Sequence, residues 1–352
     1  MLRFARIGTV NPLRMMSTLT CRVPPPATVV LSKIRGLEDA FNKRGFDVSK
    51  FFWADPSSLT DEDQETLAIC EVIIGEPGVV APILHKCPKL KWLQSTFAGC
   101  NQLLDHPRRD YVATRLSGVF GPDMAEYVAM HILTRERAYM EERARQASKE
   151  WLGAHESATG TAGEFRRLSD LNLGVLGLGD IGSEIARAMK AGFRMRTLGC
   201  RARPSTTCTP FVDKVYGIDE LRVFLAECDY VVSVLPSTPA TRGLLGGEAL
   251  KAMQLRQGVL INVGRGDVLP ESDALQALNE GWIAHLVADV FEVEPLPPSS
   301  PLWSHPKVTV SPHVSAVSKA SDVVEAFAAN AELYASSGVS ALNHKFDFYR
   351  GY

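Results

Sequence analysis

Short apolar runs alternate with helix-like stretches along most of the chain from Thr28 onward. Continuous runs of branched and aliphatic residues are typical of strands that are buried on both faces, as in a parallel sheet covered by helices. The alternation therefore predicts an α/β protein with parallel sheets. We expect strands at residues 28–31, 72–74, 90–93, 173–176, 197–198, 230–235, 259–263, 285–290 and 308–310.

Helical periodicity separates these runs. A helix is expected over residues 37–44, and another around 185–189. A long helix is predicted from residue 122 to about residue 148, with Asp123 as its capping residue. A last helix is expected over 318–335, close to the end of the sequence.

The strand–helix rhythm runs twice along the chain, so we expect two domains of Rossmann-like or flavodoxin-like architecture. No low-complexity linker separates them, and the predicted long helix is the expected boundary. We place an outer domain at residues 27–122 and 319–352. A second domain at 123–318 is inserted into it, and a flexible N-terminal extension precedes both at 1–26.

The composition excludes several classes of function. The chain has 352 residues, 45% of them hydrophobic and 22% charged, which is ordinary for a globular protein with a sizeable core. A formal net charge of −2 gives no basic footprint for nucleic acid and no attraction to an anionic membrane, and no apolar run reaches spanning length. The 7 cysteines include no C-x-x-C pair, so neither a disulfide framework nor a metal site is expected. Reduced thiols indicate an intracellular protein.

The first residues differ in composition from the rest. No acidic residue precedes Glu38, while Arg3, Arg6, Arg14 and Arg22 recur among Ser, Thr and apolar residues. This composition is found in mitochondrial transit peptides, and equally in disordered tails that contain no targeting signal. Two compartments therefore stay open, the mitochondrion and the cytoplasm.

A G-x-G-x-x-G pattern lies between a predicted strand and a predicted helix, at Gly177, Gly179 and Gly182. In that context the first glycine permits a tight turn, the second lets the backbone approach a pyrophosphate, and the third lets the helix pack closely on the strand. The helix N-terminus supplies free N–H groups and a partial positive charge for phosphates. The inserted domain is therefore predicted to bind a dinucleotide along Gly177, Gly179, Asp180, Ile181 and Gly182.

The end of the next predicted strand bears on the choice of dinucleotide. A site for NAD places Asp or Glu there to bind the ribose 2′-hydroxyl, but this sequence has Arg201 and Arg203 and no acid. Arginine suits a 2′-phosphate through its charge and its planar fork. We therefore predict NADPH in preference to NADH; the alternative is that both arginines are solvated surface residues.

Polar residues follow three further strands, where open α/β sheets bind ligands. Arg265 is suited to hold a carboxylate and polarise the neighbouring carbonyl. His313 is suited to supply a proton near neutral pH, and Glu294 to orient its imidazole. Asp289 ends a strand and is placed to bind the nicotinamide amide. Each residue alone has a structural explanation, but the set in this order predicts hydride transfer to a 2-oxo acid.

In this order, the motifs resemble those of the D-isomer-specific 2-hydroxyacid dehydrogenase family, over nearly all of residues 28–352. The resemblance implies an NAD(P)-dependent oxidoreductase acting on CH–OH groups, with Arg265, Glu294 and His313 as the catalytic residues. It implies that the outer domain binds the 2-oxo or 2-hydroxy acid substrate through the N–H groups of Ala98 and Gly99, and that the protein is a homodimer. Further cofactor contacts are implied at Leu235, Pro236, Thr241, Val263, Gly264, Asp289, His313 and Ser315.

Residues 295–303 and the ending Arg350-Gly351-Tyr352 are similar to the glyoxylate/hydroxypyruvate reductase A group of this family. That similarity implies NADPH as cofactor and glyoxylate or hydroxypyruvate as substrate. Asp180 and Gly264 depart from the family pattern, which often has Arg and Ser or Ala at these positions. A carboxylate beside a pyrophosphate is unfavourable unless it points away.

A different class of function is compatible with the same motifs. Transcriptional corepressor relatives of this family sense a dinucleotide and use it to control assembly, and fold does not separate the two functions. Such relatives can retain catalytic residues. Arg265, Glu294 and His313 therefore favour an enzyme but do not exclude a dinucleotide-sensing protein. The lack of long disordered tails with partner motifs favours the enzyme.

Overall fold

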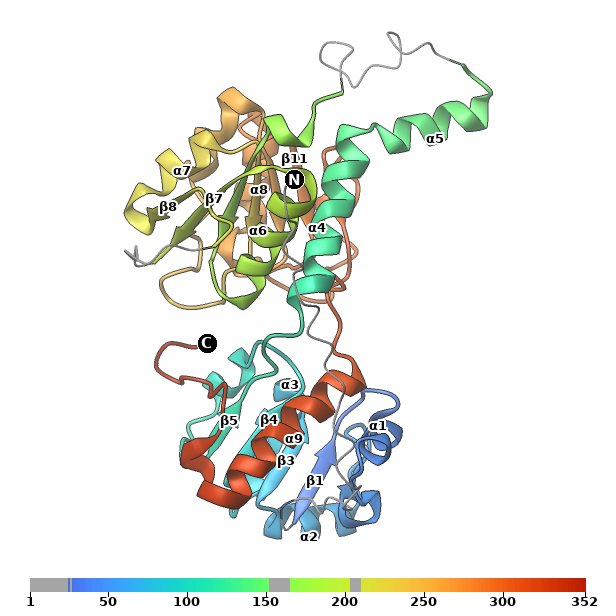
Figure 1. Ribbon diagram of the computed structural model, residues 1–352, viewed down its shortest axis with the longest axis vertical. Coiled ribbons are helices and arrows are strands. Elements are labelled where there is room, and N and C mark those ends of the chain that lie inside the picture. The colour runs from blue at the N-terminus through green and yellow to red at the C-terminus, as the bar shows by residue number, and fades with distance from the viewer. Residues whose placement is uncertain (1–24, 26, 152–164, 203–209) are drawn as a thin grey trace, which may run out of the picture.

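The computed structural model describes residues 25, 27–151, 165–202 and 210–352. These residues form two lobes, each built around a parallel β-sheet (Figure 1). The predicted fold class, α/β with two Rossmann-like or flavodoxin-like domains, is confirmed. The proposed N-terminal extension, except Pro25, and Arg203 lie outside the described residues.

The first lobe contains a 5-stranded sheet in the order β2-β1-β3-β4-β5, with all neighbours parallel. This order reverses direction between β1 and β3, as in flavodoxin-like sheets. Its strands are β1 (Thr28–Leu31), β2 (Phe52–Trp53), β3 (Val72–Gly75), β4 (Trp92–Ser95) and β5 (Val112–Thr114). Its helices are α1 (Leu37–Lys43), α2 (Asp61–Ile69), α3 (Pro77–Val80) and α9 (Ala320–Ser337).

The second lobe contains a 7-stranded parallel sheet in the order β12-β11-β10-β9-β6-β7-β8. The order reverses between β6 and β9, which is the switch point of a doubly wound sheet, where ligands bind. Its strands are β6 (Asn172–Leu176), β7 (Arg196–Arg201), β8 (Lys214–Gly217), β9 (Tyr230–Ser233), β10 (Val259–Asn262), β11 (His285–Ala288) and β12 (Val308–Val310). Its helices include α4 (Gly121–Glu136), α6 (Asp180–Phe193), α7 (Leu221–Glu227) and α8 (Glu271–Asn279), while α5 (Tyr139–Ser148) projects from the lobe (Figure 1).

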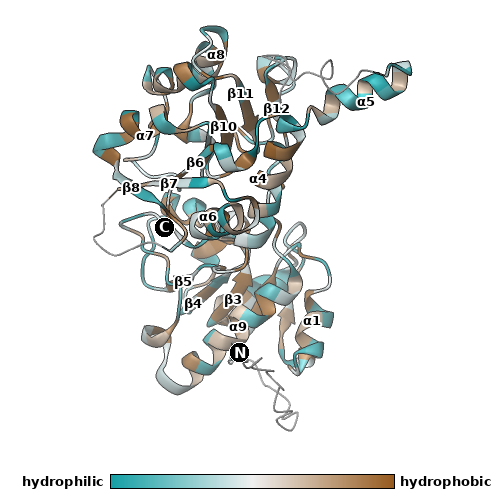
Figure 2. Ribbon diagram, turned by 45° about the horizontal axis from the view of Figure 1, so that its top comes forward, coloured by the Kyte–Doolittle hydropathy of each residue, from teal (hydrophilic) through white to brown (hydrophobic). Residues whose placement is uncertain are grey.

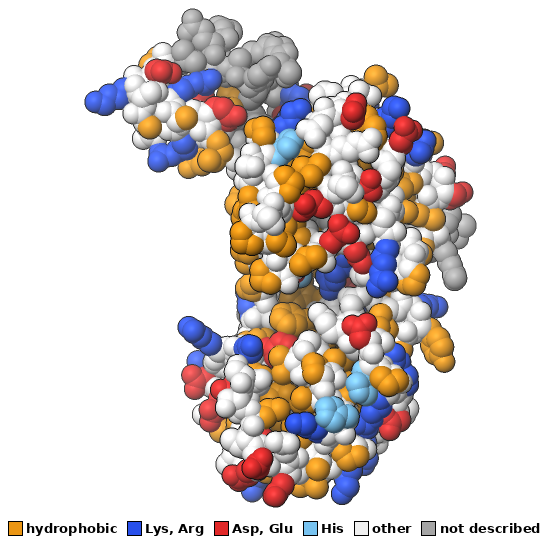
Figure 3. All heavy atoms as spheres, turned by 180° about the vertical axis from the view of Figure 1, so that it is seen from behind, with side chains coloured by type: hydrophobic (Ala, Val, Ile, Leu, Met, Phe, Trp, Pro, Cys, Tyr) orange, Lys and Arg blue, Asp and Glu red, His pale blue; other side chains and the backbone are white. Residues whose placement is uncertain are grey.

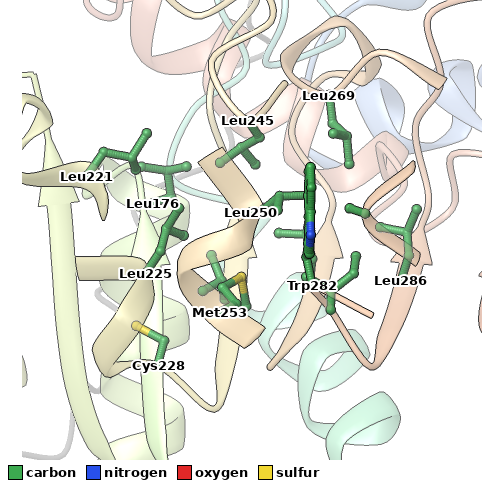
Figure 4. Packing of buried hydrophobic residues seen from close by; sticks show 14 of the residues in the cluster. Leu176, Leu221, Leu225, Cys228, Leu245, Leu250, Met253, Leu269, Trp282 and Leu286 are labelled. Carbon is green, nitrogen blue, oxygen red and sulfur yellow. The ribbon is translucent and has the colours of Figure 1, made fainter. Parts of the chain in front are cut away.

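Both faces of the second sheet are buried, which accounts for the uninterrupted apolar runs in its central strands. On β10, Leu260 packs into the cluster on one face and Ile261 into the cluster on the other. Figure 4 shows the first of these clusters, where Met253, Trp282 and Leu286 fill the space beside the sheet. In Figure 2 the strands β10 and β11 are coloured as hydrophobic.

Helix α9 brings the chain back to the first lobe after the second sheet is complete. Its Phe327 stacks on Trp92 with ring centroids 5.1 Å apart, and meets the edge of Phe41 at 5.5 Å. The helix therefore packs on the first sheet, although it follows the last strand of the second in sequence. We retain 122/123 and 318/319 as proposed domain boundaries; the first falls at the start of α4 and the second just before α9.

The single long helix predicted over 122–148 is wrong. The segment forms α4 and α5, separated at Ala138, whose backbone is left-handed with φ 47°. Asp123 is not the capping residue but lies in the first turn of α4, where its carboxylate accepts a hydrogen bond from Lys319 Nζ at 2.9 Å. No helix in the described part of the chain is long and apolar enough to cross a membrane.

Candidate active site

The predicted site residues lie where the two lobes face each other. Most of them occupy the loops that follow β4 in the first lobe and β6, β9, β10, β11 and β12 in the second, while Asp180, Ile181 and Gly182 begin α6 and Arg201 ends β7. Carboxyl ends of parallel strands share one edge of a sheet, so these loops gather at one place. Figure 3, seen from behind, shows the molecule indented between the lobes, with charged side chains at the indentation.

The glycine turn between β6 and α6 has the geometry that a dinucleotide loop requires. Gly177 has φ 104°, which glycine adopts without strain, and its N–H donates to the Cys200 carbonyl at 2.9 Å. A Cβ on Gly182 would overlap the Gly177 carbonyl oxygen, so only glycine lets α6 approach this closely. A Cβ on Gly179 would meet nothing within 4 Å, so the space before the helix N-terminus is open.

Asp180, the departure in this loop, is hydrogen-bonded to the segment before α4. Its Oδ2 accepts a hydrogen bond from Ser117 Oγ at 2.5 Å, just before α4 begins. The carboxylate therefore ties the glycine turn to the connection between the lobes. In the first turn of α6 its charge is also favourable to the helix dipole.

Arg201 ends β7 beside the glycine turn, and it is partly buried. Its Nε is buried and has no hydrogen-bond partner among the described residues. The carboxylate of Glu220, on the neighbouring segment after β8, instead accepts from the Gly217 N–H at 3.1 Å. Arg201 is thus a cation with an unsatisfied donor at the place where an adenosine ribose is expected.

The loops after β9 and β10 lie against each other. A Cβ on Gly264 would lie 2.6 Å from the Leu235 carbonyl oxygen, which explains glycine at this position. Thr241 Oγ1 donates to the Pro236 carbonyl at 2.6 Å, so this predicted contact residue holds its own loop in shape. Val263 is buried beneath the loop.

Arg265 comes from the second lobe and lies against Gly99 of the first. Its guanidinium occupies the space that a Cβ on Gly99 would fill, so the cation and the Ala98–Gly99 backbone converge. Its Nη1 donates to the Gly264 carbonyl at 2.7 Å. Desolvation lowers the pKa of Arg265, and the nearby Glu294 carboxylate opposes that shift. An arginine remains charged under these conditions.

Asn101 is a residue of the candidate site that the sequence reasoning missed. Its Oδ1 accepts from Arg265 Nε at 3.3 Å, and its Nδ2 donates to the Ser237 carbonyl at 2.9 Å. One amide thus joins the first lobe to the second and orients the guanidinium. The only signal in the sequence is its position two residues after Gly99.

His313 and Glu294 form a hydrogen-bonded pair at the other side of the site. His313 Nδ1 lies 2.8 Å from Glu294 Oε2, and the Phe291 N–H donates to Glu294 Oε1 at 2.9 Å. Burial raises the pKa of Glu294, but the His313 and Phe291 hydrogen bonds and the Arg265 charge lower it overall. A carboxylate only accepts, so Nδ1 carries a proton and Nε2 is directed elsewhere.

Asp289 is fully buried at the end of β11. Its carboxylate accepts hydrogen bonds from the Ser311 hydroxyl and from the Val314 and Ser315 N–H groups. The Ser315 hydroxyl is buried and finds no partner among the described residues. In this structure Asp289 is therefore engaged with the loop that carries His313.

The glycine turn, the open helix N-terminus and the two sheets define a Rossmann-type dinucleotide-binding oxidoreductase, and the residues present fit that cofactor. Residues 129–315 match the sequence profile described as the NAD binding domain of D-isomer specific 2-hydroxyacid dehydrogenase. The chain belongs to the D-isomer specific 2-hydroxyacid dehydrogenase family. The predicted resemblance and the predicted class, an NAD(P)-dependent oxidoreductase acting on 2-hydroxy acids, are confirmed.

Solved structures of this family are similar over nearly the whole chain. A family protein from Aeromonas salmonicida is 33% identical, with a TM-score of 0.79, covering 92% of this chain and 100% of that one. An NADPH-dependent glyoxylate/hydroxypyruvate reductase from Sinorhizobium meliloti, in complex with NADP and sulfate, is 26% identical, with a TM-score of 0.77, covering 92% and 99%. A D-isomer specific 2-hydroxyacid dehydrogenase from Xanthobacter autotrophicus, in complex with NADPH and MES, is 27% identical, with a TM-score of 0.77, covering 93% and 100%.

The glycine turn yields a paired test on one helix. Gly182→Ala introduces a Cβ into the Gly177 carbonyl, so we expect dinucleotide affinity to fall by at least about tenfold, with a lower melting temperature. Gly192→Ala places a methyl group in open space on the same helix, so affinity should be unchanged and stability should rise by roughly 0.5–1 kcal/mol. Fluorescence titration with NADPH and thermal unfolding measure both. Equal behaviour of the two variants would contradict this account of Gly182.

Proposed function

We propose that the protein is an NADPH-dependent reductase of short 2-oxo acids, with glyoxylate and hydroxypyruvate as the expected substrates. The observation that carries this proposal is the pairing of His313 with Glu294 in a site where Arg265 lies against Gly99. The similarity to the Sinorhizobium meliloti reductase, whose named activity is the one proposed, supports it. The compartment, mitochondrial or cytoplasmic, stays a prediction because the arginine-rich segment lies outside the described residues.

The first step is binding of the substrate carboxylate. Arg265 supplies the positive charge, and the N–H groups of Ala98 and Gly99 supply further donors at the same place. Asn101 accepts from Nε and the Gly264 carbonyl accepts from Nη1, and together they orient the guanidinium that we expect to bind the substrate. Polarisation of the adjacent carbonyl by the cation prepares its carbon to accept a hydride.

The second step is reduction of the carbonyl. When bound, NADPH supplies the hydride that adds to the carbonyl carbon. His313 Nε2–H gives its proton to the carbonyl oxygen as the carbon–oxygen double bond becomes single, which yields the 2-hydroxy acid. Glu294 holds Nδ1–H and stabilises the imidazolium before transfer. The His313 side chain is 46% exposed, so it regains a proton from solvent.

An activity panel tests this function. We expect oxidation of NADPH with glyoxylate and hydroxypyruvate, and less with pyruvate and branched 2-oxo acids. His313→Gln, the control that assigns turnover to this site, should lower kcat by roughly 10²–10⁴-fold, the range of general acid catalysis. Steady-state rates followed at 340 nm measure both. Tight NADPH binding without turnover of any acid would contradict the proposal and favour a dinucleotide-sensing protein.

Arg201 supports the preference for NADPH over NADH, because its buried Nε, beside the glycine turn, has no hydrogen-bond partner within the described part of the chain. We expect Arg201→Ala to lower kcat/KM for NADPH by about 10- to 100-fold, the worth of hydrogen bonds to a charged group, while kcat/KM for NADH changes little. Arg196→Ala, at the opposite end of the same strand, is the matched control. An equal loss with both cofactors in Arg201→Ala would argue against 2′-phosphate recognition.

We also propose that the protein is a homodimer and that α5 belongs to its interface. None of the residues of this 10-residue helix is buried. Its two large hydrophobic side chains at the start are exposed, Tyr139 to 55% and Met140 to 65%. Figure 3 shows the helix standing clear of the lobe with hydrophobic side chains on it. A helix this short is marginal in water without packing, so a second copy of the chain is the partner we propose.

A mass measurement tests the dimer. The wild-type protein should have twice the mass of one chain by light scattering at micromolar concentration. Met140→Asp should shift it toward the monomer, because a charge in an apolar interface is costly. Leu255→Asp, at a side chain 97% exposed on the second lobe, should leave the dimer intact. A monomeric wild-type protein would refute the proposed interface.

A further inference from the structure

A chain of partly buried hydroxyl groups runs from α4 to the residues that support His313. The Tyr127 hydroxyl lies 2.6 Å from Ser311 Oγ, and Ser311 Oγ donates to Asp289 Oδ1 at 2.6 Å. Ser311 has one hydroxyl proton and gives it to the carboxylate, so Tyr127 is the donor in the first bond. The proposed reaction steps use neither hydroxyl.

Asp289 in turn holds the backbone of the His313 loop. The His313 N–H donates to the carbonyl oxygens of Asp289 at 2.9 Å and of Ser311 at 3.1 Å. The Val314 N–H donates to Asp289 Oδ1 and the Ser315 N–H to Oδ2, at 2.9 Å each. Successive N–H groups around one carboxylate form an anion-binding nest, and here the anion is the protein's own side chain.

His313 needs this support because its backbone is strained. Its φ is 55°, in the left-handed region that residues with a Cβ adopt at an energetic cost. Such a conformation persists only where the surrounding structure imposes it. The side chain that must donate a proton is therefore aimed by a backbone that Asp289 keeps in place.

Tyr127 is a stable end for the hydroxyl chain. Burial raises its pKa to about 12, so its proton stays in place through the pH range of an assay. Its ring meets the edge of the His131 imidazole with centroids 4.4 Å apart, which limits its rotation. Tyr127 also lies on α4, which packs against the second sheet.

We propose that Tyr127 and Ser311 are positioning residues for proton transfer, which act through Asp289 to fix the strained backbone of His313. The hydroxyl pair orients the Asp289 carboxylate, the carboxylate binds the N–H groups of Val314 and Ser315, and these hold the imidazole toward the substrate. The effect on turnover rests on the proposed reductase function. The effect on the loop itself does not.

Kinetics of hydroxyl-deletion variants test the chain. Tyr127→Phe and Ser311→Ala should each lower kcat by about 3- to 10-fold, the worth of one hydrogen bond. Ser311→Thr, which retains the hydroxyl, should restore kcat. Because both residues act through one carboxylate, the double variant should be no slower than Ser311→Ala alone. Tyr111→Phe is the control, since that buried hydroxyl makes no hydrogen bond within the described residues.

A second measurement does not depend on activity. Amide hydrogen exchange of a peptide covering residues 309–318 should quicken in Tyr127→Phe and Ser311→Ala and stay at the wild-type rate in Ser311→Thr and Tyr111→Phe. If the wild-type protein reduces no 2-oxo acid, the proposed function fails while this exchange pattern still decides the positioning role. Unchanged exchange in Tyr127→Phe, or losses of kcat that multiply in the double variant, would overturn the inference.

Discussion

The site depends on contact between a cation from one lobe and a backbone from the other. Arg265 fills the space left by the absent side chain of Gly99. The Asn101 amide accepts a hydrogen bond from the Arg265 guanidinium and donates one to the Ser237 carbonyl. Each lobe contributes one side of this contact, the guanidinium from the second lobe and the Ala98–Gly99 backbone from the first. The chain must therefore leave the first lobe through α4 and return as α9, so that both sheets present their carboxyl ends to the same space.

Most of the buried framework could be predicted from the sequence, because strands covered on both faces produce uninterrupted apolar runs. The strands that the pattern did not predict, β2, β5 and β8, all lie at sheet edges. An edge strand has one neighbour and more exposure, so its sequence carries a weaker signal. The break at Ala138 was missed because helical periodicity continues across it, and an alanine rarely marks a left-handed residue.

The proposed site residues were found where a residue type alone suggests a chemical role, as for Arg265, Glu294 and His313. Residues that act by holding others were not found. Asn101, Ser117 and Ser311 are ordinary polar residues whose partners lie far away in sequence. Such contacts arise only when the loops meet. The position of Gly264 shows the same limit, because its need for glycine comes from the neighbouring Leu235 carbonyl.

The hydrogen bond between Asp180 and Ser117 connects the glycine turn with the segment that links the two lobes. One partner belongs to the turn proposed to hold the dinucleotide, and the other to the segment about which the lobes would move. The bond therefore connects the position of the glycine turn to that of the segment that leads into α4. By reciprocity, a substrate that favours the closed arrangement tightens cofactor binding by the same factor by which the cofactor tightens substrate binding. Such a linkage is symmetric between the two ligands, so it favours neither order of binding.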